Sequence, residues 1–455
     1  MVSDVGTDAG SEARAGEGPV RPSLPGLTPE DAELLSRVPA SNRRANGVPG
    51  PEEAQARTRA AVLVREALGD LLVPDGLRVS PLGAAWSSDL DLHLTSLPGP
   101  ERLRELGWVC LDPLLSRLGW PGAGRWGVAE VGLILAKADL QVGPPPDPVR
   151  SVLERGFRRG EVRAREVLEL RALSRDGREI PPEHPVVTAA AAAEASLGGA
   201  ALARWRAGSP AAPPVPLGRR TGRLRRLARG LRDRATAASR PAVAVSGVDG
   251  SGKTLLVEAL ARDLGRVGIP ATRIWTRPGM GLGGLEGLAR AGRRVLGQGA
   301  RTGVERVGGG EPPGGLASRR GVLGWAWAVV VTVAFLRDIR GQRRRARGVL
   351  LYERHLLDAL ATLETVYAGP DLGLARWLVR RFLPRADLTL FLEVSTETAL
   401  SRKPADLFGA EALRGQVETC QRYAAEAPGL VRMDGTRPPR ELATEAFAAV
   451  ARLGS

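Results

Sequence analysis

The sequence is short of cysteine, lysine and aromatic residues. Its two cysteines, Cys110 and Cys420, lie in different halves of the chain and can build neither a disulfide framework nor a zinc site. The chain does not open on a charged and then apolar signal peptide, so we expect a cytoplasmic protein. Its lysines number only three: Lys137, Lys253 and Lys403. Since arginine occupies most basic positions of this chain, the few positions that hold lysine indicate a need for a compact ammonium group.

The chain also lacks a hydrophobic run that is long enough to cross a bilayer. The segment that comes nearest, 321–336, has 16 residues, whereas a membrane-spanning helix needs about 20. An arginine-rich stretch follows at 337–347, as would suit a cytoplasmic membrane anchor. We expect 321–336 to form a buried helix, and peripheral contact with a membrane stays open as the alternative. Trp325 and Trp327 cannot share one face of a helix, so one should be buried and the other should face a groove or a neighbouring loop.

The formal charge of +15 is the strongest compositional bias. Such a charge would suit a nucleic acid or an anionic surface. The excess of arginine comes with an excess of alanine, glycine and proline, however, which is typical of GC-rich coding. We therefore expect no specific nucleic-acid partner.

The 455 residues are enough for two domains. Residues 1–55 predict a disordered tail with a short helix at 29–35. Residues 56–207 mix helical and strand-like segments and predict a smaller α+β domain. A Pro/Arg-rich linker follows at 208–240. Residues 241–455 alternate between strands and helices, which predicts an α/β domain with a parallel sheet flanked by helices.

The segment 247–254, G-V-D-G-S-G-K-T, matches the phosphate-binding pattern G-x-x-x-x-G-K-[ST] without departures. An apolar run precedes it and an amphipathic helical pattern follows. The backbone N–H groups of such a loop cradle phosphates, and the N-terminus of the helix adds partial positive charge. We predict that Lys253 reaches the outer phosphates of ATP and that the Thr254 hydroxyl binds Mg²⁺. The residues predicted to bind the cofactor are Gly247, Asp249, Gly250, Ser251, Gly252, Lys253 and Thr254.

The form G-x-D-G-S-G-K-T, with an acid inside the loop, resembles the loop of thymidylate kinases. Three further segments agree in order: T-R-P-G at 276–279, L-L-Y-E-R-H at 350–355, and L-F-L-E-V at 390–394 with S-R-K after it at 401–403. They are similar to the family's T-R-E-P-G, to its D-R-Y or D-R-H, and to the strand, helix and start of its basic lid. The resemblance covers most of the C-terminal half. It implies a P-loop NTPase fold that transfers a phosphoryl group from ATP to a nucleoside monophosphate.

The resemblance also implies roles for the charged residues. Arg277 and Arg354 would clamp the phosphate of the acceptor, since a guanidinium group matches phosphate oxygens. Asp249 would contact a sugar hydroxyl of the acceptor, and Glu353 would orient the acceptor or a water on Mg²⁺. The basic pair at 402–403 would close over the transferring group, because phosphoryl transfer needs positioned and neutralised phosphates. The predicted catalytic residues are therefore Asp249, Lys253, Glu353, Arg354, Arg402 and Lys403.

Plainer interpretations of these residues stay open. Arg277 could be a solvated loop residue, Glu353 and Arg354 a structural ion pair, and the basic pair at 402–403 a favourable end to a helix. The departures from the family lie on the acceptor side: the missing glutamate in T-R-P-G, a Gly-rich insertion at 297–319, and His355 where a tyrosine is common. Divergent members of the family occur beside polysaccharide-synthesis proteins. An ATP-binding regulatory or assembly protein of surface-polysaccharide synthesis, with little kinase turnover, is thus the alternative function. A homodimer is also left open.

In the N-terminal half, the segment 87–92 reads S-S-D-L-D-L. On a strand, Asp89 and Asp91 would lie on one face, where they could share a metal ion as a second site. The segment resembles the S-D-x-D-L core of polymerase-β-like nucleotidyltransferases, which implies a third carboxylate from Asp139 or Glu130. An active two-metal site, an inactive relative and a plain strand edge all stay open.

Overall fold

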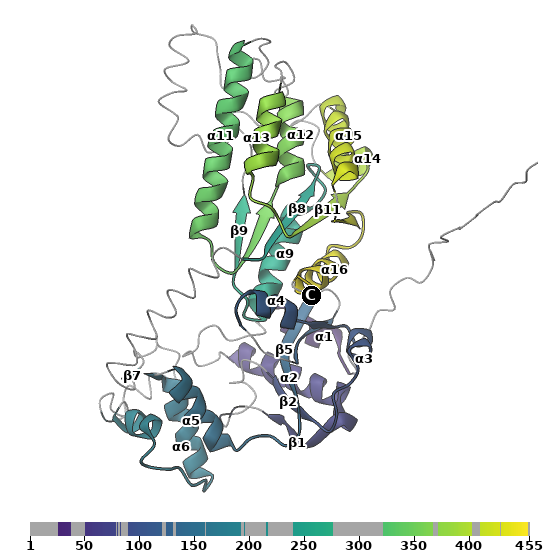
Figure 1. The fold of residues 1–455 in the computed structure, drawn as a ribbon. Coiled ribbons are helices and arrows are strands. Elements are labelled where there is room, and N and C mark those ends of the chain that lie inside the picture. The colour runs from purple at the N-terminus through teal and green to yellow at the C-terminus, as the bar shows by residue number, and fades with distance from the viewer. Residues whose placement is uncertain are drawn as a thin grey trace, which may run out of the picture.

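The structure is a computed structural model in which residues 26–37, 51–78, 80, 82, 90–120, 124–130, 133–159, 161–192, 195, 215–216, 240–275, 322–366, 372–402, 410–427 and 429–453 are described. Two five-stranded sheets organise these residues, one in each half of the chain. In Figure 1 the N-terminal sheet lies below and the C-terminal sheet above it.

The N-terminal sheet is mixed, with the strand order β1-β2-β5-β4-β3. Only β2 and β5 pair in parallel, and the other neighbours are antiparallel. Leu90, Leu92 and Leu94 alternate along β2 and are buried against helix α2 (Pro51–Ala67) and the neighbouring strands. The strands are β1 (Leu72–Arg78), β2 (Leu90–Leu94), β3 (Trp108–Cys110), β4 (Arg125–Glu130) and β5 (Leu133–Val142).

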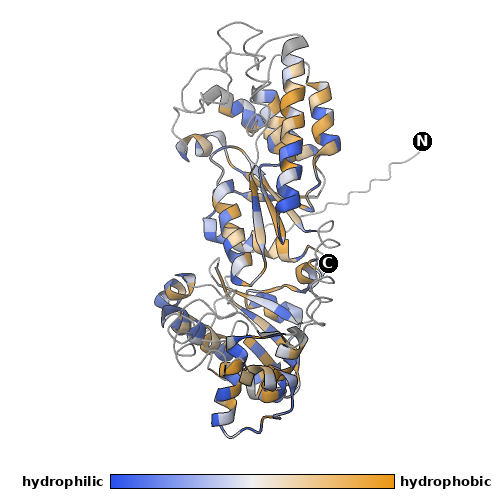
Figure 2. Ribbon diagram, turned by 90° about the vertical axis from the view of Figure 1, so that its left-hand side faces the viewer, coloured by the Kyte–Doolittle hydropathy of each residue, from blue (hydrophilic) through white to orange (hydrophobic). Residues whose placement is uncertain are grey.

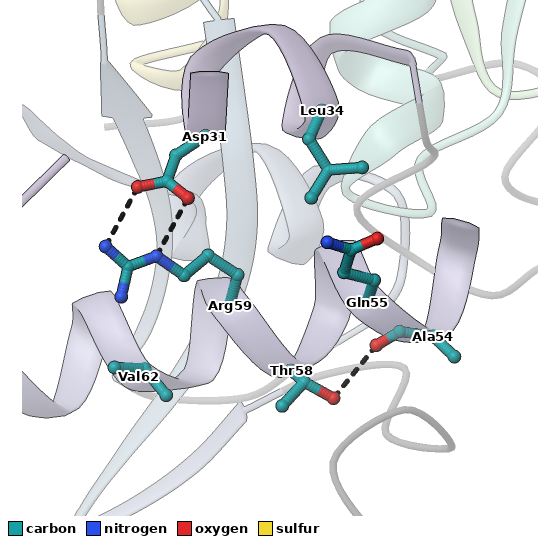
Figure 3. A pocket seen from close by; sticks show the side chains of 7 residues that line it. All are labelled: Asp31, Leu34, Ala54, Gln55, Thr58, Arg59 and Val62. Carbon is teal, nitrogen blue, oxygen red and sulfur yellow. Dashed lines mark hydrogen bonds and ion pairs between the residues drawn. The ribbon is translucent and has the colours of Figure 1, made fainter. Parts of the chain in front are cut away.

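Residues 26–37 confirm the short helix that the sequence predicts at 29–35 within the tail 1–55. They contain helix α1 (Pro29–Arg37), whose Leu35 is buried in the core of the N-terminal sheet. Arg59 of α2 donates two hydrogen bonds to Asp31, of 2.9 and 2.8 Å, as Figure 3 shows. This hydrogen bonding lowers the pKa of Asp31 to about 2. A buried leucine and ion pairs to α2 thus fix a helix that is polar over most of its surface.

A small helical unit follows the N-terminal sheet. Helices α5 (Pro148–Arg159) and α6 (Ala164–Arg175) form an apolar cluster of their own. Strand β6 (Glu161–Val162) pairs with β7 (Val215–Pro216), which lies in the segment predicted as a linker. The remaining short elements are the 3₁₀ helix η1 (Gly69–Leu71), α3 (Pro100–Glu105) and α4 (Asp112–Arg117).

The C-terminal sheet is entirely parallel, with the order β9-β10-β8-β11-β12. Its central strand β8 is buried along its whole length, and its side chains alternate between the two faces. Val243 and Val245 pack against one helical layer, whereas Ala242 and Ala244 pack against the other. This arrangement confirms the predicted α/β class. The strands are β8 (Ala242–Gly247), β9 (Ala271–Trp275), β10 (Val349–Glu353), β11 (Leu388–Glu393) and β12 (Leu430–Asp434).

Helices cover both faces of this sheet (Figure 1). One face carries α9 (Lys253–Arg266) and α16 (Pro439–Ala451). The opposite layer is α11 (Val322–Arg345), α12 (Leu356–Val366), α13 (Gly373–Phe382), α14 (Thr396–Arg402) and α15 (Ala410–Glu426).

Helix α11 contains the apolar segment 321–336 from Val322 onward. Val331, Phe335 and other side chains are buried in the core, so the predicted buried helix is confirmed. Trp327 packs partly buried against that core, while Trp325 is 38% exposed, so neither tryptophan is fully buried as one was predicted to be. Figure 2 shows α11 from its outer side, largely orange, with blue at its arginine-rich lower end. None of the helices in the described part of the chain has the length and hydrophobicity to cross a membrane.

The two halves share one apolar core. Leu111, Leu114 and Ile134 of the N-terminal half pack against α9 and α16. Arg266, at the end of α9, is buried and donates hydrogen bonds to the backbone carbonyls of Ile134 and Leu35. Burial lowers the pKa of its guanidinium to about 10. Separating the halves would expose these leucines and leave Arg266 without its carbonyl acceptors.

Candidate functional site

Residues 247–254, which we call the glycine-rich loop, connect β8 to α9. Gly250 and Gly252 have φ angles of 88° and 95°, in the left-handed region that favours glycine. A Cβ atom at Gly250 would also lie only 2.8 Å from the carbonyl oxygen of Ala399. The strand, the loop and the helix thus follow each other as predicted, and the first turn of α9 begins at Lys253.

The Lys253 side chain is folded back over this loop. Its ammonium donates hydrogen bonds of 2.6 Å to the carbonyls of Gly247 and Val248. Carboxylate oxygens of Asp249 and Asp358 lie 3.7 and 3.8 Å from it. Burial lowers the pKa of Lys253, and the two carboxylates oppose that shift. An anion that binds in the loop would have to draw the ammonium away from these four oxygens.

Asp358 is a member of this cluster that the sequence analysis missed. It lies on α12, is buried, and has its pKa raised by burial, with Lys253 acting in the opposite direction. A sequence signal was present, since Asp358 is an acid in the otherwise apolar stretch L-L-D-A-L-A at 356–361. That stretch directly follows the predicted site residues Glu353 and Arg354.

Thr254 and Glu353 form a second contact between α9 and the sheet. The Thr254 hydroxyl donates a 2.6 Å hydrogen bond to Oε1 of Glu353, the last residue of β10. The other carboxylate oxygen accepts a hydrogen bond from Arg273 on β9. Sequence reasoning missed Arg273, because nothing in the short stretch A-T-R-I-W marks it.

Arg354 has a strained backbone and a buried partner. Its φ angle is 71°, which is costly for a residue other than glycine. Its guanidinium donates to the carboxylate of Asp249 in the glycine-rich loop. The suggested structural ion pair between Glu353 and Arg354 is therefore wrong. Glu353 turns to Thr254 and Arg273, and Arg354 turns to Asp249.

His355 packs in the core, as expected for a residue without a catalytic role. Its Nε2 lies 2.9 Å from the carbonyl oxygen of Pro384, and its ring contacts Tyr352 with centroids 4.8 Å apart. Burial lowers the pKa of His355 to about 4. The imidazole is thus neutral at physiological pH.

Only part of the predicted lid and acceptor clamp can be placed. Arg402 ends α14 and donates a 2.8 Å hydrogen bond to the carbonyl of Gly435. A Cβ atom at Gly435 would lie 3.3 Å from the carbonyl oxygen of Ser251, so this contact is beside the glycine-rich loop. Lys403 and Arg277 lie outside the described residues.

In the N-terminal sheet, Asp91 and Asp139 are register partners on the parallel strands β2 and β5. On β4, Arg125 pairs with Asp139, and Glu130 lies at the other end of that strand. Of the two candidates for the third carboxylate, Asp139 is therefore the one beside Asp91. Lys137 lies 3.6 Å from Asp139, so a cation offsets part of the negative charge. Asp89 lies outside the described part of the chain. Within that part, His, Cys, Asp and Glu residues form no group of three or more that could hold a metal ion.

A shallow pocket of about 440 Å³ lies between α1 and α2 (Figure 3). Asp31 and Arg59 line it and are bound to each other. It is built from the N-terminal helices and contains no residue of the glycine-rich loop. The residues that line it are Asp31, Leu34, Ala54, Gln55, Thr58, Arg59 and Val62.

The oxygen atoms around the glycine-rich loop suit Mg²⁺ bound to a nucleotide. Mg²⁺ prefers oxygen ligands and is usually held by one or two protein groups together with substrate phosphates. The Thr254 hydroxyl and the Glu353 carboxylate, 2.6 Å apart, provide such groups at the end of the loop. The hydroxyl of Ser251 is buried in the same loop and has no hydrogen-bond partner among the described residues. The loop and the end of β10 therefore offer oxygen atoms of the kind that Mg²⁺ prefers.

Comparison with known proteins assigns no family. No family model matches the chain, and no curated protein matches it either. A functional assignment must therefore be argued from the site itself.

Proposed function

We propose that the C-terminal half is a P-loop NTPase-type domain that transfers a phosphoryl group from ATP to a nucleoside monophosphate or a similar phosphorylated small molecule. One observation carries the proposal. Lys253, the Thr254–Glu353 pair and the Arg354–Asp249 pair converge at the carboxyl ends of β8 and β10. Parallel sheets bind their ligands at this edge.

On the donor side, the glycine-rich loop would hold the ATP phosphates with its backbone N–H groups and the N-terminus of α9. Lys253 would leave the carbonyls of Gly247 and Val248 and bind the outer phosphates. Thr254 and Glu353 would hold Mg²⁺, which would neutralise part of the phosphate charge when it is bound. The chain's own contribution is thus the positioning of two phosphates.

On the acceptor side, the Arg354–Asp249 pair supports an exchange of partners. The phosphate of the acceptor would replace Asp249 as the partner of Arg354. The freed carboxylate could then accept a hydrogen bond from a hydroxyl of the same acceptor. Arg402, which donates a hydrogen bond to the carbonyl of Gly435 beside the loop, would bind the transferring group.

The N-terminal half supports a weaker proposal, that its mixed sheet is similar to a nucleotidyltransferase core. Asp91 beside Asp139 on parallel strands is the supporting observation. Because this half shares its core with α9 and α16, metal binding by these acids should be measured on the whole chain.

The experiment is a screen for ADP release from the intact protein with ATP, Mg²⁺ and a panel of nucleoside monophosphates and sugar phosphates. We expect one class of acceptor to raise ADP release well above that of ATP alone, and Lys253→Ala to abolish the rise. ATP binding without acceptor-dependent turnover would instead favour the regulatory or assembly function. The absence of ATP binding would refute both.

A further inference from the structure

Arg273 links the edge of the C-terminal sheet to the end of its neighbouring strand. It lies on the edge strand β9, which pairs with β10 so that Trp275 is opposite Glu353. Arg273 precedes Trp275 by two residues, and its side chain extends along the strand direction to donate a hydrogen bond to Oε2 of Glu353. A second nitrogen donates a 3.0 Å hydrogen bond to Glu258 on α9.

The two oxygens of the Glu353 carboxylate therefore have separate partners. Oε1 accepts from the Thr254 hydroxyl at 2.6 Å, and Oε2 accepts from Arg273. With both oxygens bound, the carboxylate cannot rotate without losing a hydrogen bond. Glu353 is buried, whereas the Arg273 side chain is 36% exposed, so the arginine approaches the carboxylate from the solvent side.

The orientation of the carboxylate determines what the Thr254 hydroxyl can bind. A hydroxyl has one proton and two lone pairs. When its proton points to Glu353, its lone pairs are left to a metal ion. If the carboxylate turned away, the proton would be free to point toward the metal position. Side chains that orient metal ligands in this way commonly change metal affinity about 10- to 100-fold when they are mutated.

We propose that Arg273 is a positioning residue of the magnesium site, which fixes the Glu353 carboxylate so that Thr254 presents a lone pair to the metal ion. This inference rests on the proposed binding of Mg²⁺ and ATP. It adds a residue that touches neither the phosphates nor the metal ion. The fork of Arg273 spans Glu353 and Glu258, which the single nitrogen of a lysine cannot do equally well.

The opposite edge of the same sheet provides a matched control. Arg432 on the edge strand β12 pairs with Glu393, the last residue of β11. This is the same arrangement of an edge-strand arginine and a strand-ending glutamate. Both partners of the control pair are exposed, and we place neither in the site.

The test is a titration of a fluorescent ATP analogue at a series of Mg²⁺ concentrations, with the intact protein and its variants Arg273→Gln, Arg273→Lys and Arg432→Gln. In Arg273→Gln we expect the half-saturating Mg²⁺ concentration to rise about tenfold, with the Mg²⁺-free nucleotide affinity changed less than about twofold. Arg273→Lys should show a smaller rise, and Arg432→Gln none. Combining Arg273→Gln with Glu353→Gln should add nothing to the effect of Glu353→Gln alone.

A purely structural role for Arg273 would give a different result. The melting temperature would fall, but the Mg²⁺ dependence of both Arg273 variants would match that of Arg432→Gln, and the proposal would be overturned. If Arg273→Gln does not fold, Arg273→Lys retains the positive charge and decides the question by the same titration. A failure of the proposed function looks different again, because the unmodified protein would then show no Mg²⁺-dependent nucleotide binding at all.

Discussion

The left-handed backbone of Arg354 allows strain and side-chain function to be separated by two substitutions at one position. Arg354→Ala and Arg354→Gly both remove the guanidinium that pairs with the buried carboxylate of Asp249. Removing one partner of such a pair costs about 3–5 kcal/mol when the remaining charge is isolated. Because Lys253 remains 3.7 Å from Asp249, we expect a loss nearer 2–3 kcal/mol in both variants.

The two variants should differ in the backbone contribution. At a φ of 71° a Cβ atom costs about 1–2 kcal/mol, which glycine avoids. Glycine loses about 0.4–1 kcal/mol through the greater entropy of its unfolded state. The free energy of unfolding of Arg354→Gly should therefore exceed that of Arg354→Ala by roughly 0.5–1 kcal/mol, as measured by urea denaturation. Equal stabilities would show that the left-handed conformation is not maintained.

The same two variants test the acceptor clamp. Both should raise the acceptor KM at least about tenfold while the affinity for ATP stays nearly unchanged. A collapse of ATP affinity in both variants would refute this reasoning and place Arg354 on the donor side. Different acceptor KM values for the two variants would show that backbone geometry, and not the guanidinium alone, sets acceptor binding.

Three further predictions concern the stability of the fold. Arg266→Ala should lower the free energy of unfolding by about 2–4 kcal/mol, since it removes the donor to buried carbonyls of the N-terminal half. Asp31 has a folded pKa of about 2, below its unfolded value, so its pairing stabilises the protein at neutral pH and ceases to do so as the pH falls through about 2. Asp31→Asn should therefore lower the melting temperature at pH 7 and change it much less at pH 2. On α11, Val331→Asp should unfold the protein, because Val331 is buried, whereas the exposed Val333→Asp should be tolerated. A change of oligomeric state or of vesicle binding in Val333→Asp, by size exclusion or co-sedimentation, would show instead that this face of α11 is an interface.

Local patterns in the sequence predict the parallel sheet and its glycine-rich loop well, because both depend on short-range signals. The apolar run 242–245, the glycines and the helical spacing after Lys253 each act within a few residues. The residues at the ends of the strands could also be predicted, and Glu353 is indeed the last residue of β10. Residues at strand ends in a parallel sheet meet at one edge, whatever their separation in sequence.

The partners across the site could not be predicted in the same way. Arg273 and Glu353 are 80 residues apart, and Arg354 and Asp249 are 105 apart. Which guanidinium meets which carboxylate depends on the order of the strands and on the strained turn at Arg354, and neither follows from local spacing. Helix α1 could be predicted at 29–35 from its local pattern, but its packing could not, since its partners come from α2 and from the core under the N-terminal sheet.

The most direct test of the account is the affinity of the intact protein for a fluorescent ATP analogue in the presence of Mg²⁺, compared with that of Lys253→Ala. The account predicts saturable binding that the substitution weakens by about tenfold to a hundredfold, because a charged hydrogen bond to phosphate contributes about 1.5–3 kcal/mol. The substituted protein should keep its fold, as judged by circular dichroism. Equal affinity of the two proteins, or no binding by either, would contradict the assignment of the glycine-rich loop as a phosphate site.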